Sequence, residues 1–336
     1  MPERKGQYTI TLSNRPTILG YAAVVGKKEG EGPLGRYFDY IFEDTTLGEK
    51  TWEKAESAMQ REAFTRALDK AGMSPSQLQY IFAGDLLNQC IASTFGLREY
   101  NVPLLGQFGA CSTMAQTLSM AAVFVDSGAA DVCSAVTSSH FCSAERQFRF
   151  PLEYGGQRPP TSQWTATGAG SVVVGMGGKG VRVAEICSGR VTDFGITDAN
   201  NMGAAMAPAA ADTLYNFFQD TATGPDDYDL IVTGDLAAVG SELLIELLDR
   251  KGVHLGKNYT DCGLLIYDRN KQDVHAGGSG CGCSASVLCS YLLGKMERRE
   301  LNNLLFVATG ALMSPTSSQQ GESIPGIAHL VHLVTV

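Results

Sequence analysis

The chain has 336 residues, of which 44% are hydrophobic and 18% are charged, and this balance predicts a packed globular protein. Its length exceeds that of a usual single hydrophobic core, so we expect two similar domains or one large α/β assembly. The net charge of −9, without any run of Lys or Arg, argues against binding to nucleic acid or directly to an anionic bilayer.

The N-terminal residues contain no apolar signal-peptide core, and the longest apolar stretches, such as 121–125, are much shorter than a membrane span. We therefore expect a soluble protein without a signal peptide. Nine cysteines, an odd number with no Cys-x-x-Cys pair, predict free thiols rather than a disulfide framework. Cys281-Gly-Cys283 alone does not indicate a metal site, so we expect neither a metal nor a cofactor of the protein's own.

In the first half of the chain, strand and helix patterns alternate. Strands are expected near 17–25, 79–85, 131–138 and 169–175, and helices near 52–72 and 112–127. The helix at 52–72 is amphipathic and ends at Gly72. Ser74-Pro75-Ser76-Gln77 resembles a capping box with proline at the first helical position, which predicts a short helical turn.

The second half repeats this alternation. Strands are expected near 181–187, 228–233, 303–309 and 327–335, and helices near 204–219, 237–251 and 284–297. Apolar strands that alternate with helices predict parallel-rich sheets covered on both faces. Gly175-x-Gly177-x-x-Gly180 matches a dinucleotide-binding string, but a strand rather than a helix follows it, so a nucleotide site is not expected.

Internal similarity indicates a duplication. Residues 78–86 resemble 228–236, and both segments are apolar strands that end in Gly-Asp-Leu. Residues 111–115 resemble 283–287, and 132–138 resemble 304–310, with one common offset. We therefore predict an N-terminal half at 1–177 and a C-terminal half at 178–336, with two sheets that share a central helical layer.

Cys111 is the strongest single candidate for a functional residue. It follows Gly109-Ala110 and precedes a helical pattern, so it lies where the positive end of a helix dipole lowers a thiol pKa and favours anion recognition. Alternatively, it is a buried small residue in a tight turn. His140 follows a buried strand, at the sheet edge where α/β proteins build sites, although an ordinary loop histidine fits the same pattern.

The segment 141–166 is expected to be a long functional loop, since it is rich in Arg, Pro and aromatic residues. Arg146, Arg149 and Arg158 are candidates to bind a carboxylate in bidentate fashion. They are equally suited to pair with acidic residues of the same loop or to line a dimer interface.

A second polar stretch at 192–206 leads into a helix. Either Asp198 or Asn200 caps that helix, or the stretch, which includes Asn201, completes the wall of a pocket near Cys111. Met202 and Met206 are suited to form apolar, adaptable walls of such a pocket.

The Cys111 turn, the duplicated halves and the glycine-rich segment 277–286 resemble the thiolase and ketoacyl-synthase superfamily. The resemblance is closer to one branch, the stage V sporulation protein AD family of spore-forming bacteria. It is carried by the segments 32–39, 48–56, 138–140, 145–151, 157–161, 163–165 and 198–203.

This resemblance implies an α/β protein with a duplicated, five-layered αβαβα fold, expected to be a homodimer. It implies binding of dipicolinic acid, or of its calcium chelate with the calcium carried by the ligand, during uptake into the developing spore. It also implies peripheral association with the inner spore membrane through other stage V A sporulation proteins.

The chain departs from the condensing enzymes of the superfamily at two motifs. Their histidine motif falls at 233–237 and their asparagine motif at 280–284, and this chain has neither residue there. Because condensation needs donors that stabilise an enolate and an oxyanion, we predict a binding protein rather than an enzyme. The alternative is an acyltransferase or condensing enzyme with Cys111 as nucleophile and His140 as a relocated base, and a third reading is a structural subunit with a vestigial pocket.

The predicted ligand site lies in the former acyl pocket, with one ligand carboxylate facing the helix that follows Cys111. The candidate ligand-binding residues are Cys111, His140, Arg146, Arg149, Arg158, Asn200, Asn201, Met202 and Thr309.

Overall fold

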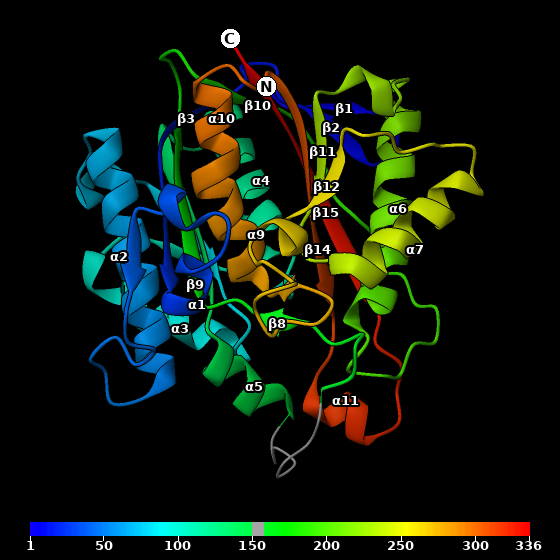
Figure 1. Cartoon of the computed structure of the whole chain (residues 1–336). Coiled ribbons are helices and arrows are strands. Elements are labelled where there is room, and N and C mark those ends of the chain that lie inside the picture. The colour runs from blue at the N-terminus through cyan, green and yellow to red at the C-terminus, as the bar shows by residue number, and fades with distance from the viewer. Residues whose placement is uncertain (150–157) are drawn as a thin grey trace.

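The structure is a computed structural model that describes residues 1–149 and 158–336, with only the backbone described at Arg149. Helices and sheets alternate in five layers (Figure 1). One outer layer contains α2 (Trp52–Ala71) and α3 (Ile91–Leu97), and the other contains α6 (Met202–Thr221) and α7 (Ala237–Asp249). The central layer contains α4 (Thr113–Asp126), α9 (Cys281–Val287) and α10 (Leu293–Glu297). This is the predicted αβαβα arrangement.

The first half contributes five strands in the order β6-β5-β7-β9-β3. Their bounds are Leu104–Gly106 for β6, Tyr80–Gly84 for β5, Val132–Ser139 for β7, Gly168–Gly175 for β9 and Thr17–Gly26 for β3. From β6 to β7 neighbouring strands are parallel, whereas β9 is antiparallel to both β7 and β3.

The second half has the same pattern, in the order β12-β11-β14-β15-β10. Their bounds are Tyr259–Asp261 for β12, Leu230–Thr233 for β11, Asn303–Ala311 for β14, Gly326–Thr335 for β15 and Val181–Cys187 for β10. Again the first three are parallel and the fourth is antiparallel to its two neighbours. The two sets of strands are therefore built alike.

One feature differs from the predicted pair of separate sheets. A single residue pair, Arg182 of β10 with Thr17 of β3, joins the two sets into one hydrogen-bonded path. The other strands and α-helices of the described chain are short: β1 (Glu3–Lys5), β2 (Thr9–Thr11), α1 (Lys27–Gly30), β4 (Tyr40–Phe42), α5 (Phe141–Arg149), β8 (Trp164–Thr165), α8 (Cys262–Leu265), β13 (Gly278–Ser279) and α11 (Pro315–Gln319).

Most predicted elements are confirmed to within two residues, and the capping box at Ser74 starts a 3₁₀ turn at Pro75–Gln77. Two expectations were wrong. The helix expected at 284–297 begins at Cys281 and contains a π-helical segment at Leu288–Leu292 between α9 and α10. The expected loop at 141–166 begins with α5, because Ala144 and Phe148 lie one helical turn apart and pack inward.

The central helices lie between apolar faces of both sheets. Met114 and Leu118 of α4 are fully buried, as are Leu288 and Leu292 of the segment opposite. These side chains belong to one hydrophobic cluster that includes strands of both halves. The central layer therefore fixes the two halves relative to each other.

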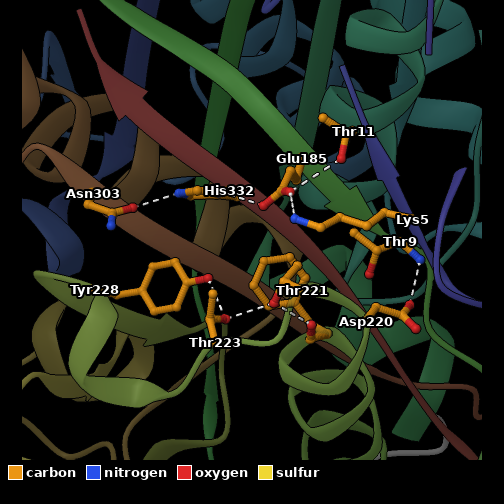
Figure 2. Close-up of polar contacts among 11 residues, drawn as sticks. Lys5, Thr9, Thr11, Glu185, Asp220, Thr221, Thr223, Tyr228, Asn303 and His332 are labelled. Carbon is orange, nitrogen blue, oxygen red and sulfur yellow. Dashed lines mark hydrogen bonds and ion pairs between the residues drawn. The ribbon is translucent and has the colours of Figure 1, made fainter. Parts of the chain in front are cut away.

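The N-terminal hairpin β1–β2 is attached to the second half by acidic side chains (Figure 2). At the end of α6, the Asp220 carboxylate accepts backbone N–H bonds from Gln7, Tyr8 and Thr9 at 2.8–2.9 Å. Burial alone would raise the pKa of Asp220, but these hydrogen bonds outweigh it and lower the pKa.

On the same side, Glu185 of β10 lies 3.2 Å from Lys5 Nζ and 3.0 Å from His332 Nδ1, and His332 Nε2 lies 2.6 Å from Asn303 Oδ1 (Figure 2). Burial would raise the pKa of Glu185, but its bonds with His332 and Lys5 lower it. This network ties the hairpin to β10, β15 and β14.

Candidate functional site

Cys111 occupies a tight turn between β6 and α4. Ala110 adopts a left-handed conformation with φ of 47°, which brings the chain sharply round. Ser112 N and Oγ both donate to Gly109 O, at 3.0 and 2.6 Å, and Thr113 Oγ1 donates to Ala110 O at 2.6 Å. These local bonds hold Cys111 immediately before the N-terminus of α4.

The second half of the chain supports this turn from behind. A Cβ atom added to Gly310 of β14 would lie 2.4 Å from Gly109 O and 3.1 Å from Cys111 N. Only glycine fits this approach of the two backbones. The position of Cys111 is therefore set by both halves.

A cavity of about 60 Å³ opens beside Cys111. Its lining is mainly apolar and comes from the first half, which includes α5, and from α6 of the second half. The lining residues are Leu86, Ala110, Cys111, Ala144, Glu145, Phe148, Thr165, Met202, Met206, Ser279, Ala311 and Met313. Cys111 and Met202, both predicted from the sequence as site residues, thus share one cavity, with Met206 beside them.

Behind Cys111 lies the fully buried Asp235, which follows β11. Its Oδ1 accepts from Thr309 Oγ1 at 2.7 Å, and its Oδ2 accepts from Gly280 N at 2.8 Å and Ser279 Oγ at 3.2 Å. Burial raises the pKa of Asp235 to about 7, although the hydrogen bonds from Thr309 and Gly280 oppose the shift.

The thiol of Cys111 lies close enough to this carboxyl group to feel its charge. Burial raises the pKa of Cys111 far above the usual range, and the charge of Asp235 raises it further. The expectation that the helix dipole gives a low thiol pKa was wrong, because desolvation and a neighbouring acid outweigh the dipole. A neutral thiol therefore faces the cavity.

Cys281 lies on the other side of Cys111. Its Sγ donates to Ser138 O at 2.9 Å, and it packs with Leu86, Ala144 and Cys111 in one hydrophobic cluster. The structure therefore places beside Cys111 residues of both segments, 233–237 and 280–284, to which the resemblance assigned the histidine and asparagine motifs of the condensing enzymes. Asp235 comes from the first of these segments and Cys281 from the second.

His140 does not line the cavity. The residue is fully buried, its Nε2 lies 2.7 Å from Thr45 O, and its Nδ1 accepts from Cys142 N at 3.2 Å. Burial lowers the pKa of His140, so the ring is neutral near pH 7. The imidazole is used to hold the 45–46 loop against the end of β7.

The predicted arginines also lie away from the cavity or outside the description. Arg146 pairs with Glu53 and lies over the Trp52 ring at 5.5 Å. Arg158 pairs with Asp273 at 2.9 Å and lies over Trp164. The side chain of Arg149 is outside the described residues, as are residues 150–157 of the predicted loop.

The remaining predicted residues hold structure around the cavity. Asn201 caps α6 by accepting from Ala204 N at 3.3 Å, and the backbone N–H of Asn200 donates to Asp198 Oδ1 at 2.9 Å. Thr309 is buried, and its hydroxyl group is hydrogen-bonded to Asp235. None of the three lines the cavity next to Met202.

Residues 6–334 match the stage V sporulation protein AD (SpoVAD) family. The chain is also 46% identical, over 324 residues, to the stage V sporulation protein AD of Bacillus subtilis (strain 168), and the match covers 96% of each chain. The chain belongs to the stage V sporulation protein AD family. It is therefore a sporulation protein with a thiolase-like fold.

Solved structures of ketosynthases share this fold at low sequence identity. The 3-oxoacyl-[acyl-carrier-protein] synthase III of Aquifex aeolicus VF5 aligns with a TM-score of 0.56 and 15% identity, covering 95% of this chain and 99% of that one. OleA of Xanthomonas campestris with bound cerulenin aligns with a TM-score of 0.61 and 12% identity, covering 95% and 98%. These likenesses show the fold of this family member and nothing of its chemistry.

Sequence reasoning missed Asp235, Ser279 and Glu145 as residues of the site. A signal for Asp235 was present, since it is the acid of the repeated Gly-Asp-Leu string. In the part of the chain that the structure describes, no group of three or more His, Cys, Asp or Glu residues is placed to hold a metal ion. Over the same residues, no helix is both long and apolar enough to span a bilayer.

Proposed function

We propose that this member of the stage V sporulation protein AD family binds dipicolinic acid, or its calcium chelate, in the Cys111 cavity during uptake into the developing spore. The observation that supports this most is the cavity itself, which is largely apolar and has a few polar groups at one end. Such a lining is typical of sites for small organic ligands.

The cavity as it stands has room for only a few water molecules. A planar ring therefore requires movement of the lining side chains. Met202, Met206 and Met313 are suited to this because methionine has three rotatable bonds and a polarizable sulfur that makes favourable contacts with aromatic rings. Phe148 of α5 offers an aromatic face on the same cavity.

The charges near the cavity favour the calcium chelate over the free dianion. Glu145 lines the cavity and Asp235 lies behind Cys111, and both carry carboxyl groups. A free dicarboxylate would meet like charge there, whereas a chelate with Ca²⁺ is neutral. The calcium in this proposal is carried by the ligand.

The surroundings of Cys111 favour binding over condensation. A nucleophilic cysteine needs a thiolate, which a neighbouring base or low pKa supplies. Here burial, and after it the charge of the neighbouring Asp235, raises the pKa of the thiol. We therefore propose that the protein is not an acyltransferase.

Calorimetric titration with dipicolinate, with and without calcium, tests the proposal. Cys111→Ala should weaken binding, whereas Cys142→Ala, a half-buried thiol that does not line the cavity, should leave affinity unchanged. Absence of binding heat for both ligand forms would contradict the proposal. An acyl thioester on Cys111 after incubation with acyl-CoA, detected by mass spectrometry, would favour the transferase.

We also propose that the protein is a homodimer joined at β6. This strand pairs only with β5 among the described strands, and apolar side chains surround its open edge. Leu105 is 41% exposed, Phe108 45% and Phe95 48%. Unpaired strand edges with exposed apolar groups are sites of chain association.

Light scattering tests the dimer. Leu105→Lys should give a monomer, because it places a charge in the apolar edge. Phe194→Lys, at an apolar residue that is 66% exposed and lies far from β6 along the chain, should leave the dimer intact. A wild-type protein with the mass of one chain at micromolar concentration would refute the proposal.

Family membership supports a last proposal, that the protein is peripheral at the inner spore membrane and held there by other stage V A sporulation proteins. Fractionation of sporulating cells tests it. The protein should sediment with membranes when those partners are present and remain in the supernatant when they are deleted. Sedimentation without the partners would contradict it.

A further inference from the structure

Three oxygen-bearing side chains line the Cys111 cavity, and they come from three different elements. Glu145 belongs to α5, Thr165 to β8 and Ser279 to β13. Apart from these side chains and the thiol of Cys111, the lining is apolar. Whether the oxygen atoms are grouped or scattered therefore decides what kind of ligand the cavity can orient.

The backbone and a hydrogen bond group these side chains at one place. Thr165 and Ser279 are direct partners in the parallel pair β8–β13, so their side chains lie on the same face of it, about 5 Å apart. Two N–H···O bonds of 2.8 Å across the pair fix this register. Thr165 Oγ1 donates to Glu145 Oε1 at 3.3 Å, which brings the carboxylate to the same place. The cavity therefore has one oxygen-rich end.

Both hydroxyl groups keep lone pairs for a further partner. Ser279 Oγ donates to Asp235 Oδ2 at 3.2 Å, and Asp235 is fully buried behind the cavity. Since Ser279 directs its proton to Asp235 and Thr165 directs its proton to Glu145, each hydroxyl oxygen can still act as an electron-pair donor. Outer hydrogen bonds of this kind orient the groups that bind metal ions.

We propose that Glu145, Thr165 and Ser279 bind the calcium ion of the dipicolinate chelate directly, and that the pyridine ring lies against the apolar lining. This inference rests on the proposed function and specifies which form of the ligand the site recognises. Ca²⁺ takes about 6–8 oxygen ligands, whereas dipicolinate supplies only its carboxylates and its ring nitrogen. A bound chelate therefore has open positions for oxygen atoms of the protein.

A carboxylate together with hydroxyl groups is a suitable donor set for these positions. Ca²⁺ is a hard cation that tolerates irregular geometry and binds carboxylates in mono- or bidentate fashion. Glu145 keeps the partners that it already has, Thr165 among them, because an ionised carboxylate offers about four lone-pair sites and the metal needs only one of them. The largely apolar surroundings strengthen the attraction between this carboxylate and the cation.

The same groups disfavour dipicolinate without its metal. Its carboxylates would face the like charge of Glu145, and the hydroxyl protons of Thr165 and Ser279 are already donated to other acids. The two forms of the ligand should therefore respond in opposite directions when the charge of Glu145 is removed. This difference is the basis of the test.

Calorimetric titration of Glu145→Gln with both ligand forms tests the proposal. The variant should bind the calcium chelate at least about tenfold more weakly, since even outer partners in a metal site are worth about 10–100-fold in affinity. It should bind metal-free dipicolinate more tightly, because a like charge is gone. Glu246→Gln, at an exposed glutamate of α7 that does not line the cavity, is the control and should change neither affinity.

Terbium(III) luminescence distinguishes direct coordination from attraction at a distance. Terbium, like calcium, is a hard cation that prefers oxygen, and dipicolinate sensitises the emission of the terbium that it chelates. Its luminescence lifetimes in light and heavy water count the water molecules that remain on the metal. The chelate bound to the wild type should carry fewer waters than the free chelate, and Glu145→Gln should restore about one of them.

If the thermal transition shows that Glu145→Gln does not fold, Thr165→Val and Ser279→Ala replace it, and each should weaken binding of the chelate and restore water to terbium. Unchanged affinity for the chelate, or an equal loss for both ligand forms, would overturn direct binding of the metal and leave the proposed function in place. A protein-bound chelate with as many waters as the free chelate would do the same. Failure of the wild type to bind either form would overturn the proposed function and this inference together.

Discussion

The contact between Gly310 and the Cys111 turn gives the sharpest prediction for the architecture of the site. In Gly310→Ala, the new Cβ would lie 2.4 Å from Gly109 O, and an ordinary contact begins at 3.4 Å, so the two backbones must separate by about 1 Å. Overpacking of this kind costs about 1–3 kcal/mol. The stiffer unfolded chain of the alanine variant offsets only about 0.4–1 kcal/mol of that.

The expected shift of the melting temperature follows from the length of the chain. At about 2.1 cal/mol/K per residue, 336 residues give an unfolding entropy of about 0.7 kcal/mol/K, so a net cost of about 0.5–2.5 kcal/mol after that offset corresponds to about 0.7–3.5 °C. Dipicolinate affinity should fall as well, because the turn that carries Cys111 moves.

Differential scanning calorimetry and ligand titration measure both effects. Gly224→Ala is the control, since Gly224 has φ of −135° and no heavy atom within 4 Å of an added Cβ. It should be neutral or slightly stabilising. A Gly310→Ala protein with the wild-type melting temperature and affinity would refute the tight contact between β14 and the turn.

Three further predictions concern stability. Asp220→Asn should speed amide hydrogen exchange at residues 7–9 and cost about 1–2 kcal/mol at neutral pH. Because folding lowers the pKa of Asp220, this difference should begin to shrink as pH falls below about 3.9 and should be lost once pH falls through the lowered pKa of the folded state; equal exchange at neutral pH would contradict the prediction. Burial raises the pKa of Glu56 to about 8, so the stability of the wild type should decline as pH rises from about 4.3 to 8. Glu56→Gln should flatten that decline in thermal melts, and an unchanged slope would contradict the prediction. Leu118→Ala in the central layer should cost about 2–5 kcal/mol in denaturant titration, and a loss below about 1 kcal/mol would indicate that the layer is loosely packed.

The sequence predicted most of the fold because the strongest signals are local. The amphipathic pattern at 52–72 and the glycine after it define α2 almost to the residue. The repeated strings predicted the two matching sets of strands. The single pair Arg182–Thr17 that joins the sets has no local signal, since it arises from how two distant strand ends meet.

The site was predicted only in part, for a physical reason. Cys111 and Met202 are marked by their place before a helix, and the structure brings them to one cavity. Asp235 and Cys281, which lie beside Cys111, are more than 100 residues away from it along the chain. Sequence alone does not show toward which neighbours the Asp235 side chain points. His140 follows the end of a strand, as site residues do, but its ring is hydrogen-bonded to the carbonyl oxygen of Thr45.

The cavity beside Cys111 lies at the interface between the duplicated halves. Leu86, Ala144 and Phe148 come from one half, and Met202, Met206 and Met313 from the other. Neither half produced as a fragment would contain a closed pocket, whatever its own stability. Any substitution that tilts one half against the other, even deep in the central helices, would reshape the pocket, so ligand affinity in this protein is a sensitive reporter of how the halves are docked.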